Sequence, residues 1–256
     1  NRCDVSMRKR VLILGGTTEA SALARALAQR SDLDVVLSLA GRTEAPTRPP
    51  IPHRIGGFGG IEGLIDYLKS QSISGVIDAT HPFAAQMTQH AAHACDALDL
   101  PRLIFTRPAW EQVEGDQWQC VGSVDAAVKA LGENPKRVFL TVGRLSLSAF
   151  RHAEQHFYFI RSIDQPEAHE MPSDTKLILA RGPFTVDEET RLMREERIDL
   201  LVTKNSGGAK TDAKLQAARV LQIPVLMIER PTLPESRVTH DLQDALAFVE
   251  THGRAP

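Results

Sequence analysis

The segment VLILGGTTEA, residues 11–20, joins an apolar run to a glycine pair and an alanine-rich continuation. A strand, turn and helix of this kind bring main-chain N–H groups close to a pyrophosphate, and the helix N-terminus adds partial positive charge. The dinucleotide pattern G-x-G-x-x-G/A fits at Gly15 and Ala20, but Thr17 replaces its central glycine. The turn therefore predicts a nucleotide site, with a tight turn that binds nothing as the alternative. Its candidate cofactor-binding residues are Gly15, Gly16, Thr17, Thr18 and Glu19, and the two threonine hydroxyls could donate to phosphate.

The end of the next apolar run indicates which nucleotide would bind. NAD-binding folds usually carry Asp or Glu there, hydrogen-bonded to the ribose 2′-hydroxyl. Here Val35–Leu39 is followed by Ala40, Gly41, Arg42 and Thr43, without a carboxylate. A guanidinium and a hydroxyl suit a 2′-phosphate, so Gly41, Arg42 and Thr43 predict NADPH. A solvated loop arginine is the alternative.

Two further loops precede helical patterns in the first half. The loop IGGFGG, residues 55–60, has four glycines in five positions, which predicts close passage of the main chain beside the cofactor at Gly57, Phe58 and Gly59. A flexible loop is the alternative. The run VIDATHPFA, residues 76–84, places polar residues beyond a strand end, where parallel sheets bind ligands. Its candidates are Asp78 and His81 for catalysis, and Ala79, Thr80 and His81 for cofactor binding; a helix cap is the alternative for His81.

The second half offers a place for an anionic substrate. In LLVTKNSGGAKTDAKLQAA, residues 200–218, a polar turn rich in N–H groups follows an apolar run, which is a second anion site by the same physics. Arginines follow three other predicted strands, each with a surface or structural role as its alternative. Together these cations predict a positive rim for a substrate with several carboxylates. The candidate substrate-binding residues are Arg144, Arg161, Arg181, Lys204, Asn205, Ser206, Gly207 and Gly208; Lys204 is also a candidate catalytic residue, as an anchor or a proton donor.

Short apolar runs alternate with helical patterns, which predicts βαβ units. The expected fold class is α/β, with two doubly wound Rossmann-like parallel-sheet halves and the active site in the crevice between them. We expect an NADP-binding domain over residues 7–115 and a substrate-side domain over 116–256, with residues 1–6 left out of the fold as a leader. Predicted strands are 11–14, 35–39, 75–78, 103–105, 138–142, 157–160, 177–180, 200–203 and 225–228. Predicted helices are 19–29, 60–71, 84–98, 124–131, 186–197, 211–221 and 242–251.

Composition excludes several classes of protein. The net charge of −2 gives no sign of nucleic-acid or membrane binding. Cys3, Cys95 and Cys120 are far apart and form no C-x-x-C pair, which favours a reducing compartment and no disulfide framework. No apolar stretch approaches the ~20 residues of a membrane span. We therefore expect a cytoplasmic monomer; no metal site is predicted, since His90 and His93 lack a third ligand at a sensible spacing.

Six motifs in this order resemble the precorrin-6A reductases of cobalamin biosynthesis: GGTTEA, AGRT, GGFGG, DATHPFA, TVGR and TKNSGG. The resemblance spans Val11 to about Val249. It implies transfer of hydride from NADPH to a carbon–carbon double bond of the precorrin-6A macrocycle, giving precorrin-6B. That tetrapyrrole carries many carboxylates. It is metal-free in the aerobic pathway and cobalt-bound in the anaerobic one. The alternatives are the cobalt-precorrin reaction, an NADP reductase or epimerase for another substrate, and a non-catalytic NADPH-sensing module.

The arginine after the second strand makes cofactor choice testable. We expect NADPH to bind more tightly than NADH by ~1–3 kcal/mol, the usual contribution of charge-assisted hydrogen bonds. Arg42→Ala should remove most of that preference and leave NADH binding little changed. Titration of both dinucleotides checks this, and equal affinities in the unmutated protein would contradict it.

Overall fold

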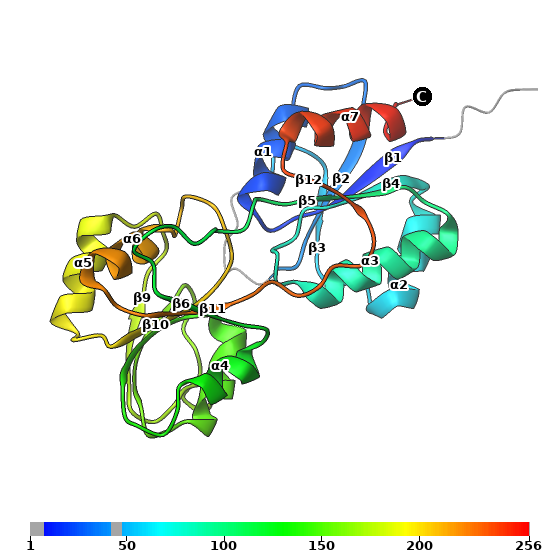
Figure 1. Ribbon diagram of the computed structural model, residues 1–256. Helices are drawn as coiled ribbons and strands as arrows, with labels where there is room; N and C mark the ends of the chain where they lie inside the picture. Colours follow the sequence, from blue (N-terminus) through cyan, green and yellow to red (C-terminus); the bar gives the residue numbers. More distant parts are fainter. Residues whose placement is uncertain (1–7, 42–47, 256) are drawn as a thin grey trace, which may run out of the picture. The chain divides into compact units, whose positions relative to one another are not determined.

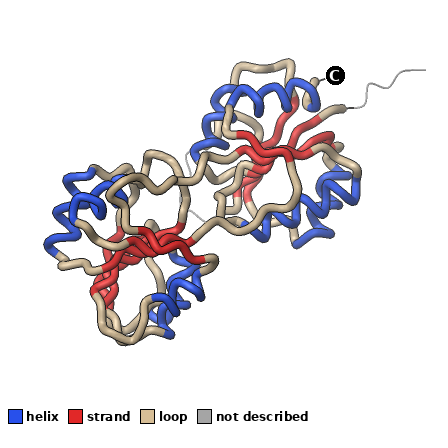
Figure 2. The backbone as a smooth tube through the Cα atoms, viewed as in Figure 1, coloured by secondary structure: helices blue, strands red, loops and turns tan. Residues whose placement is uncertain are grey.

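The computed structural model describes residues 8–41 and 48–255. Within these ranges the chain forms two compact units (Figure 1). The first comprises the described parts of residues 1–107 and 232–256, and the second comprises residues 108–231. In each unit a six-stranded parallel sheet lies between helices on both faces (Figure 2). The predicted α/β class with two parallel sheets is confirmed.

The sheet of the first unit has the strand order β3–β2–β1–β4–β5–β12, and every neighbouring pair is parallel. Its strands are β1 (Arg10–Leu14), β2 (Asp34–Leu39), β3 (His53–Ile55), β4 (Ile73–Asp78), β5 (Arg102–Phe105) and β12 (Arg237–Thr239). This is the order of a dinucleotide-binding fold, in which the direction of winding reverses between the first and fourth strands. Ligands of such sheets bind beyond the carboxyl ends of the strands at that reversal.

Helices cover both faces of this sheet (Figure 1). They are α1 (Thr18–Leu27) and α7 (Leu242–His252) on one face, and α2 (Gly60–Ser70) and α3 (Ala85–Leu98) on the other. Alternate side chains of β1 serve the two cores: Val11 and Ile13 pack with α1 and α7, whereas Leu12 and Leu14 pack with α2 and α3. An apolar run buried on both faces is what a central parallel strand requires.

The second unit repeats this order as β9–β8–β7–β10–β11–β6, again with parallel neighbours. Its strands are β6 (Trp118–Val121), β7 (Arg137–Thr141), β8 (Phe157–Ser162), β9 (Thr175–Leu179), β10 (Leu200–Lys204) and β11 (Val225–Ile228). One face carries α5 (Val186–Glu195) and α6 (Ala213–Leu221). The other carries α4 (Val124–Ala130) and the 3₁₀ helix η1 (Arg144–His152), and a short 3₁₀ turn, η2 (Ala168–Glu170), lies beside η1.

The two sheets exchange their sixth strands. After β5 the chain enters the second unit and forms β6 beside β11, and after β11 it returns to form β12 beside β5. The predicted second domain, residues 116–256, therefore needs a correction, since β12 and α7 belong with the first sheet. The apolar face of α7, with Ala245, Phe248 and Val249, packs in the first core. Periodicity identifies such a helix but does not say which sheet it covers.

All predicted strands and helices are present, with ends that differ by at most two residues. The strands that the sequence missed are β3, β6 and β12, which are short and lie at or near sheet edges. Within the described ranges, no helix combines the length and apolar character needed to cross a membrane.

The second unit buries an unusual group of charges between its sheet and α5 and α6. Arg161 of β8 donates to both carboxylate oxygens of Glu189, at 2.5 and 2.9 Å. Lys214, at the start of α6, is 5% exposed, and its Nζ lies 5.3 Å from the ring centroid of Trp110. Among the described residues its ammonium makes no hydrogen bond or ion pair. Burial, aided by the charge of Arg161, lowers the pKa of Lys214 to about 7, against the opposite influence of Glu189 and Asp212.

This burial predicts a stability that depends on pH. Unfolded Lys214 regains a pKa of 10.5, so between about pH 7 and pH 10.5 the unfolded state binds more protons and stability rises with pH. Below that window the ammonium is buried while charged. We expect Lys214→Met to have a higher free energy of unfolding than the wild type near neutral pH, with the difference shrinking as the pH approaches ~10.

Urea titrations across this pH range measure the difference directly. The matched control is Lys129→Met, which removes an exposed lysine of α4 and should give a small, constant difference. A Lys214→Met difference that does not vary with pH would contradict a titrating buried lysine.

Candidate functional site

The turns that follow β1 and β4 are tied together at the carboxyl edge of the first sheet. The Gly15 amide donates to the Ser38 carbonyl at 2.9 Å, and the Ala79 amide donates to the Leu14 carbonyl at 2.9 Å. The Thr17 hydroxyl donates to the Ala79 carbonyl at 2.7 Å. The structure thus brings together the two predicted cofactor segments at the reversal of strand order, where a dinucleotide fold binds its pyrophosphate.

The geometry of the first turn favours glycine at both positions, most strongly at Gly16. A Cβ on Gly15 would lie 2.7 Å from Leu37 Cδ1, and Gly16 has a φ of +111°, which side chains disfavour. Thr17 stands where the dinucleotide pattern has its central glycine. It is the N-cap of α1, and its Oγ1 accepts from the Ala20 amide at 3.1 Å. Its hydroxyl is therefore engaged twice within the protein. The predicted hydrogen bond from this hydroxyl to phosphate has no support, whereas the first amides of α1 have no intrahelical partners.

Thr18 and Glu19 begin α1 beside this turn. The Thr18 hydroxyl donates to Glu19 Oε2 at 2.7 Å, and Glu19 Oε1 accepts from Arg107 Nη1 at 3.1 Å. A carboxylate alone at this place would repel phosphate, and the guanidinium offsets its charge. Sequence reasoning missed Arg107, because it lies 88 residues away from its partner.

Asp78 is 4% exposed, and both of its oxygens accept hydrogen bonds. Oδ1 accepts from the Thr80 amide at 3.1 Å and from the Thr80 hydroxyl at 2.6 Å, and Oδ2 accepts from the Thr88 hydroxyl at 2.6 Å. This carboxylate thus positions the turn that carries Thr80 and His81, and the catalytic role of Asp78 stays a prediction. His81 Nδ1 accepts from the Phe83 amide at 3.2 Å, which places the proton of the neutral ring on Nε2. A role for His81 as a proton donor stays a prediction.

The remaining predicted cofactor residues follow β2 and β3. Gly41 has a φ of +73°, and a Cβ there would lie 2.8 Å from Ile55 Cγ2. Arg42 and Thr43 lie outside the described residues. Gly57 and Gly59 flank Phe58, whose ring packs edge-on against Tyr67 with the centroids 5.1 Å apart. Arg54 lies beside the rings of Phe58 and Tyr67. It is absent from the residues predicted from the sequence, because its position is set by the pairing of β3 with β2.

The carboxyl edge of the second sheet gathers the predicted cations. Strands β10, β7, β8 and β9 are consecutive in this sheet. Lys204 ends β10, and its burial lowers its pKa. Arg144 follows β7 and pairs with Glu170 at 2.9 Å, whereas Arg181, past β9, is exposed. Arg161 is the exception, since it is 8% exposed and its guanidinium is held by Glu189.

The turn after β10 is held by a segment far away in the sequence. Asn205 Oδ1 accepts from the Trp110 amide at 2.7 Å, and Asn205 Nδ2 donates to the Trp110 carbonyl at 2.9 Å. Trp110 Nε1 donates to the Gly208 carbonyl at 2.8 Å. A Cβ on Gly207 would lie 2.1 Å from the Pro108 carbonyl oxygen. The Asn205 side chain, predicted to bind substrate, thus fixes the turn. The Ser206 amide donates to the Lys204 carbonyl at 2.8 Å, so the amides of Gly207 and Gly208 are the candidate anion site.

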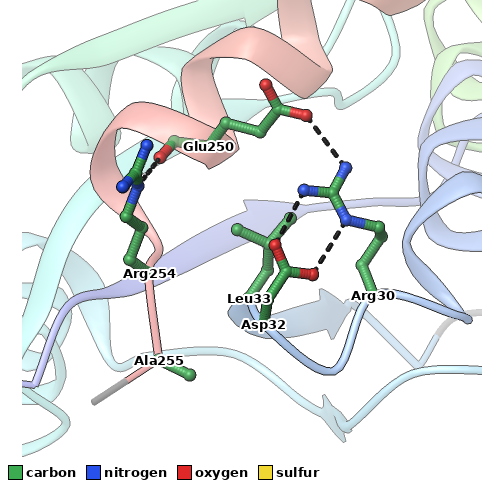
Figure 3. Close-up of a pocket in the computed structure, with 6 residues that line it drawn as sticks. All are labelled: Arg30, Asp32, Leu33, Glu250, Arg254 and Ala255. Atoms are coloured by element: carbon green, nitrogen blue, oxygen red, sulfur yellow. Dashed lines mark hydrogen bonds and ion pairs between the residues drawn. The ribbon is translucent and has the colours of Figure 1, made fainter.

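The first unit also has a cavity of about 490 Å³ at the opposite edge of its sheet (Figure 3). It is lined by Arg30, Asp32, Leu33, Glu250, Arg254 and Ala255. Arg30 binds both oxygens of Asp32 and donates to Glu250, at 2.9 Å in each case. These contacts connect the turn before β2 to the end of α7. This cavity therefore lies at the amino ends of the strands, away from the predicted cofactor edge.

The chain matches the family model for the precorrin-6x reductases CbiJ/CobK over residues 10–250. A precorrin-6A reductase of Rhodococcus erythropolis is 49% identical over 94% of this chain and 98% of the relative. A precorrin-6A reductase of Rhodobacter capsulatus is 47% identical over 96% of this chain and 98% of the relative. By contrast, a cobalt-precorrin-6A reductase of Priestia megaterium is 24% identical over 92% of this chain and 96% of the relative.

A solved structure described as CobK precorrin-6A reductase superposes with a TM-score of 0.88, at 47% identity and with 97% of this chain and 98% of that chain covered. The resemblance expected from the six motifs is thereby confirmed over both sheets. With matches of this extent in sequence and in fold, the chain belongs to the precorrin-6x reductase family, CbiJ/CobK.

Proposed function

We propose that this protein is an NADPH-dependent precorrin-6A reductase, which reduces one carbon–carbon double bond of the metal-free macrocycle to give precorrin-6B. The observation that carries the proposal is the near-half identity to curated precorrin-6A reductases along almost the whole chain. The lower identity to a cobalt-precorrin-6A reductase favours the metal-free substrate. A sensing module without catalysis has no observation in its favour.

The fit of a dinucleotide rests on the first turn. The glycine pair leaves the main chain open at Gly16, where a Cβ would meet no atom within 4 Å, and the amides that open α1 face outward from the helix end. Gly15 to Glu19, Gly41, Gly57 to Gly59 and Ala79 to His81 would hold the cofactor, together with Arg42 and Thr43. NADPH supplies the hydride when bound. The protein's residues bind it and orient it against the carboxyl edge of the sheet.

The substrate's carboxylates would bind at the carboxyl edge of the second sheet. Arg144, Arg181 and Lys204 would supply the positive charge, and the amides of Gly207 and Gly208 would supply hydrogen bonds. Arg161 is left out of this set because its guanidinium is buried and paired with Glu189, whereas Arg144, although paired with Glu170, has a side chain that is 38% exposed. Two groups could protonate the macrocycle: His81 through Nε2, and Lys204, whose pKa is lowered by burial toward the range of a general acid.

We propose further that the protein works as a monomer in the cytoplasm, without nucleic-acid or membrane partners. The net charge of −2 supports the absence of nucleic-acid and membrane partners, since it offers no general attraction to polyanions.

The deciding experiment is the absorbance change on mixing the protein with NADPH and precorrin-6A. We expect loss of the nicotinamide absorbance together with a shift of the macrocycle spectrum. The metal-free and cobalt-bound substrates should be compared side by side, and faster turnover of the cobalt-bound form would contradict the proposed substrate. Absence of turnover with either would remove the proposal.

Substitutions of Lys204 separate its two possible roles. If Lys204 anchors a carboxylate, Lys204→Arg should retain most of kcat, and Lys204→Ala should raise KM about tenfold or more, as for loss of a charged hydrogen bond. If Lys204 donates the proton, both substitutions should abolish kcat, because arginine stays protonated. We expect the first result. Full activity and an unchanged KM in Lys204→Ala would exclude this turn from the substrate site.

His81 is tested by the same assay. His81→Ala should lower kcat by about 10²-fold if the imidazole donates a proton, with a much smaller change in NADPH affinity. Its pH–rate profile should lose one limb. Unaltered turnover at every pH would leave His81 with a structural role, as in its hydrogen bond with the Phe83 amide.

A further inference from the structure

Arg54 of β3 carries a positive charge that no carboxylate balances among the described residues. Its Nη1 donates to Ser38 Oγ at 2.8 Å and to the Gly56 carbonyl at 2.9 Å, and its Nη2 donates to the Gly57 carbonyl at 2.8 Å. All three acceptors are neutral. A guanidinium has five N–H donors, so the Nε proton and one Nη2 proton have no acceptor within the described chain.

The orientation of this guanidinium is fixed by aromatic packing. It lies 4.0 Å from the ring centroid of Phe58 and 5.1 Å from that of Tyr67. Behind it, a Cβ on Gly63 would lie 1.7 Å from the Phe58 carbonyl oxygen, so the loop rests directly on α2. A planar cation stacked in this way is prepared for bidentate contact with an anion and loses little freedom on binding.

Strand pairing places Arg54 beside the candidate cofactor turn. In the parallel register of β2 and β3, Arg54 is the partner of Ser38. The Ser38 carbonyl accepts from the Gly15 amide, so one residue connects the first turn to this arginine. In a sheet of this order the adenosine ribose lies beyond the end of the second strand. Arg54 is therefore near the place of the ribose 2′ position, with its charge unbalanced.

We propose that Arg54 binds the 2′-phosphate of the dinucleotide and so helps to select NADPH over NADH. The inference rests on the proposed function for the identity of the cofactor. Sequence reasoning gave this role to Arg42, and it had no means of finding Arg54, which stands before a glycine loop. The competing explanation is that Arg54 only pins the loop of residues 56–58 through its carbonyl contacts.

Binding measurements with four ligands separate these explanations: NADPH, NADH, 2′,5′-ADP and 5′-ADP. For Arg54→Gln we expect the affinities for NADPH and 2′,5′-ADP to fall at least about tenfold, with those for NADH and 5′-ADP within about twofold. Arg54→Lys keeps the charge but loses the fork, so it should show a smaller loss on the same two ligands. The matched control is Arg30→Gln, at the opposite edge of the same sheet, which should change none of them.

Equal losses on the phosphorylated and unphosphorylated ligands in a folded variant would overturn the proposal in favour of the pin. Unchanged preference in both Arg54 variants would overturn it as well. Failure of the proposed function looks different: the wild type would bind NADPH and 2′,5′-ADP with an Arg54-dependent preference, yet would not reduce precorrin-6A. A wild type without any preference for the phosphorylated ligands would reject both.

Discussion

The hydroxyl of Thr17 is the contact on which the first unit's candidate cofactor edge depends. It accepts from the Ala20 amide and donates to the Ala79 carbonyl, so one oxygen caps α1 and joins the turn after β1 to the turn after β4. A glycine at this position, as in the common dinucleotide pattern, would provide neither contact. Threonine in place of glycine therefore caps α1, while the other amides of the first turn of α1 stay available to an anion.

A polar side chain also fixes the main chain at the end of the fourth strand in each of the two sheets. Asp78 ends β4 and Asn205 follows β10, which are the fourth strands of their respective sheets in the dinucleotide order. Each side chain uses its polar atoms on its own surroundings: Asp78 on Thr80 and Thr88, and Asn205 on the main chain of Trp110. Both residues were predicted to contact ligands, and in the structure both hold the main chain of the turns where ligands are proposed to bind. Preorganised amides are effective for anions because they need no rearrangement when the charge arrives.

The second unit buries charged side chains in its interior, where apolar side chains alone could fill the space. The Arg161–Glu189 pair is enclosed between Phe139 and Phe184, whose ring centroids lie 5.0 and 3.7 Å from the guanidinium carbon. Removal of one partner from such a pair typically costs about 3–5 kcal/mol, since the other charge stays buried. Lys214 lies in the same layer without a counterion of its own. The burial of Lys214, which lowers its pKa, is therefore the part of this group that costs stability near neutral pH.

The sequence by itself determined the α/β class, the positions of the predicted strands and helices, and the family, because apolar periodicity and glycine spacing are local properties of the chain. Tertiary structure decided which sheet each edge strand joins, so the assignment of residues 232–256 needed correction once β12 paired with β5. It also decided which charges are buried in ion pairs. Arg161 and Lys204 look alike in the sequence, each at the end of an apolar run, and only the tertiary structure shows that Arg161 is paired with Glu189 of α5. Arg54 gained its place in the same way, from the register of β3 on β2. Whether a charge is balanced depends on neighbours brought together by folding from distant parts of the chain, and a linear pattern holds no record of those distances.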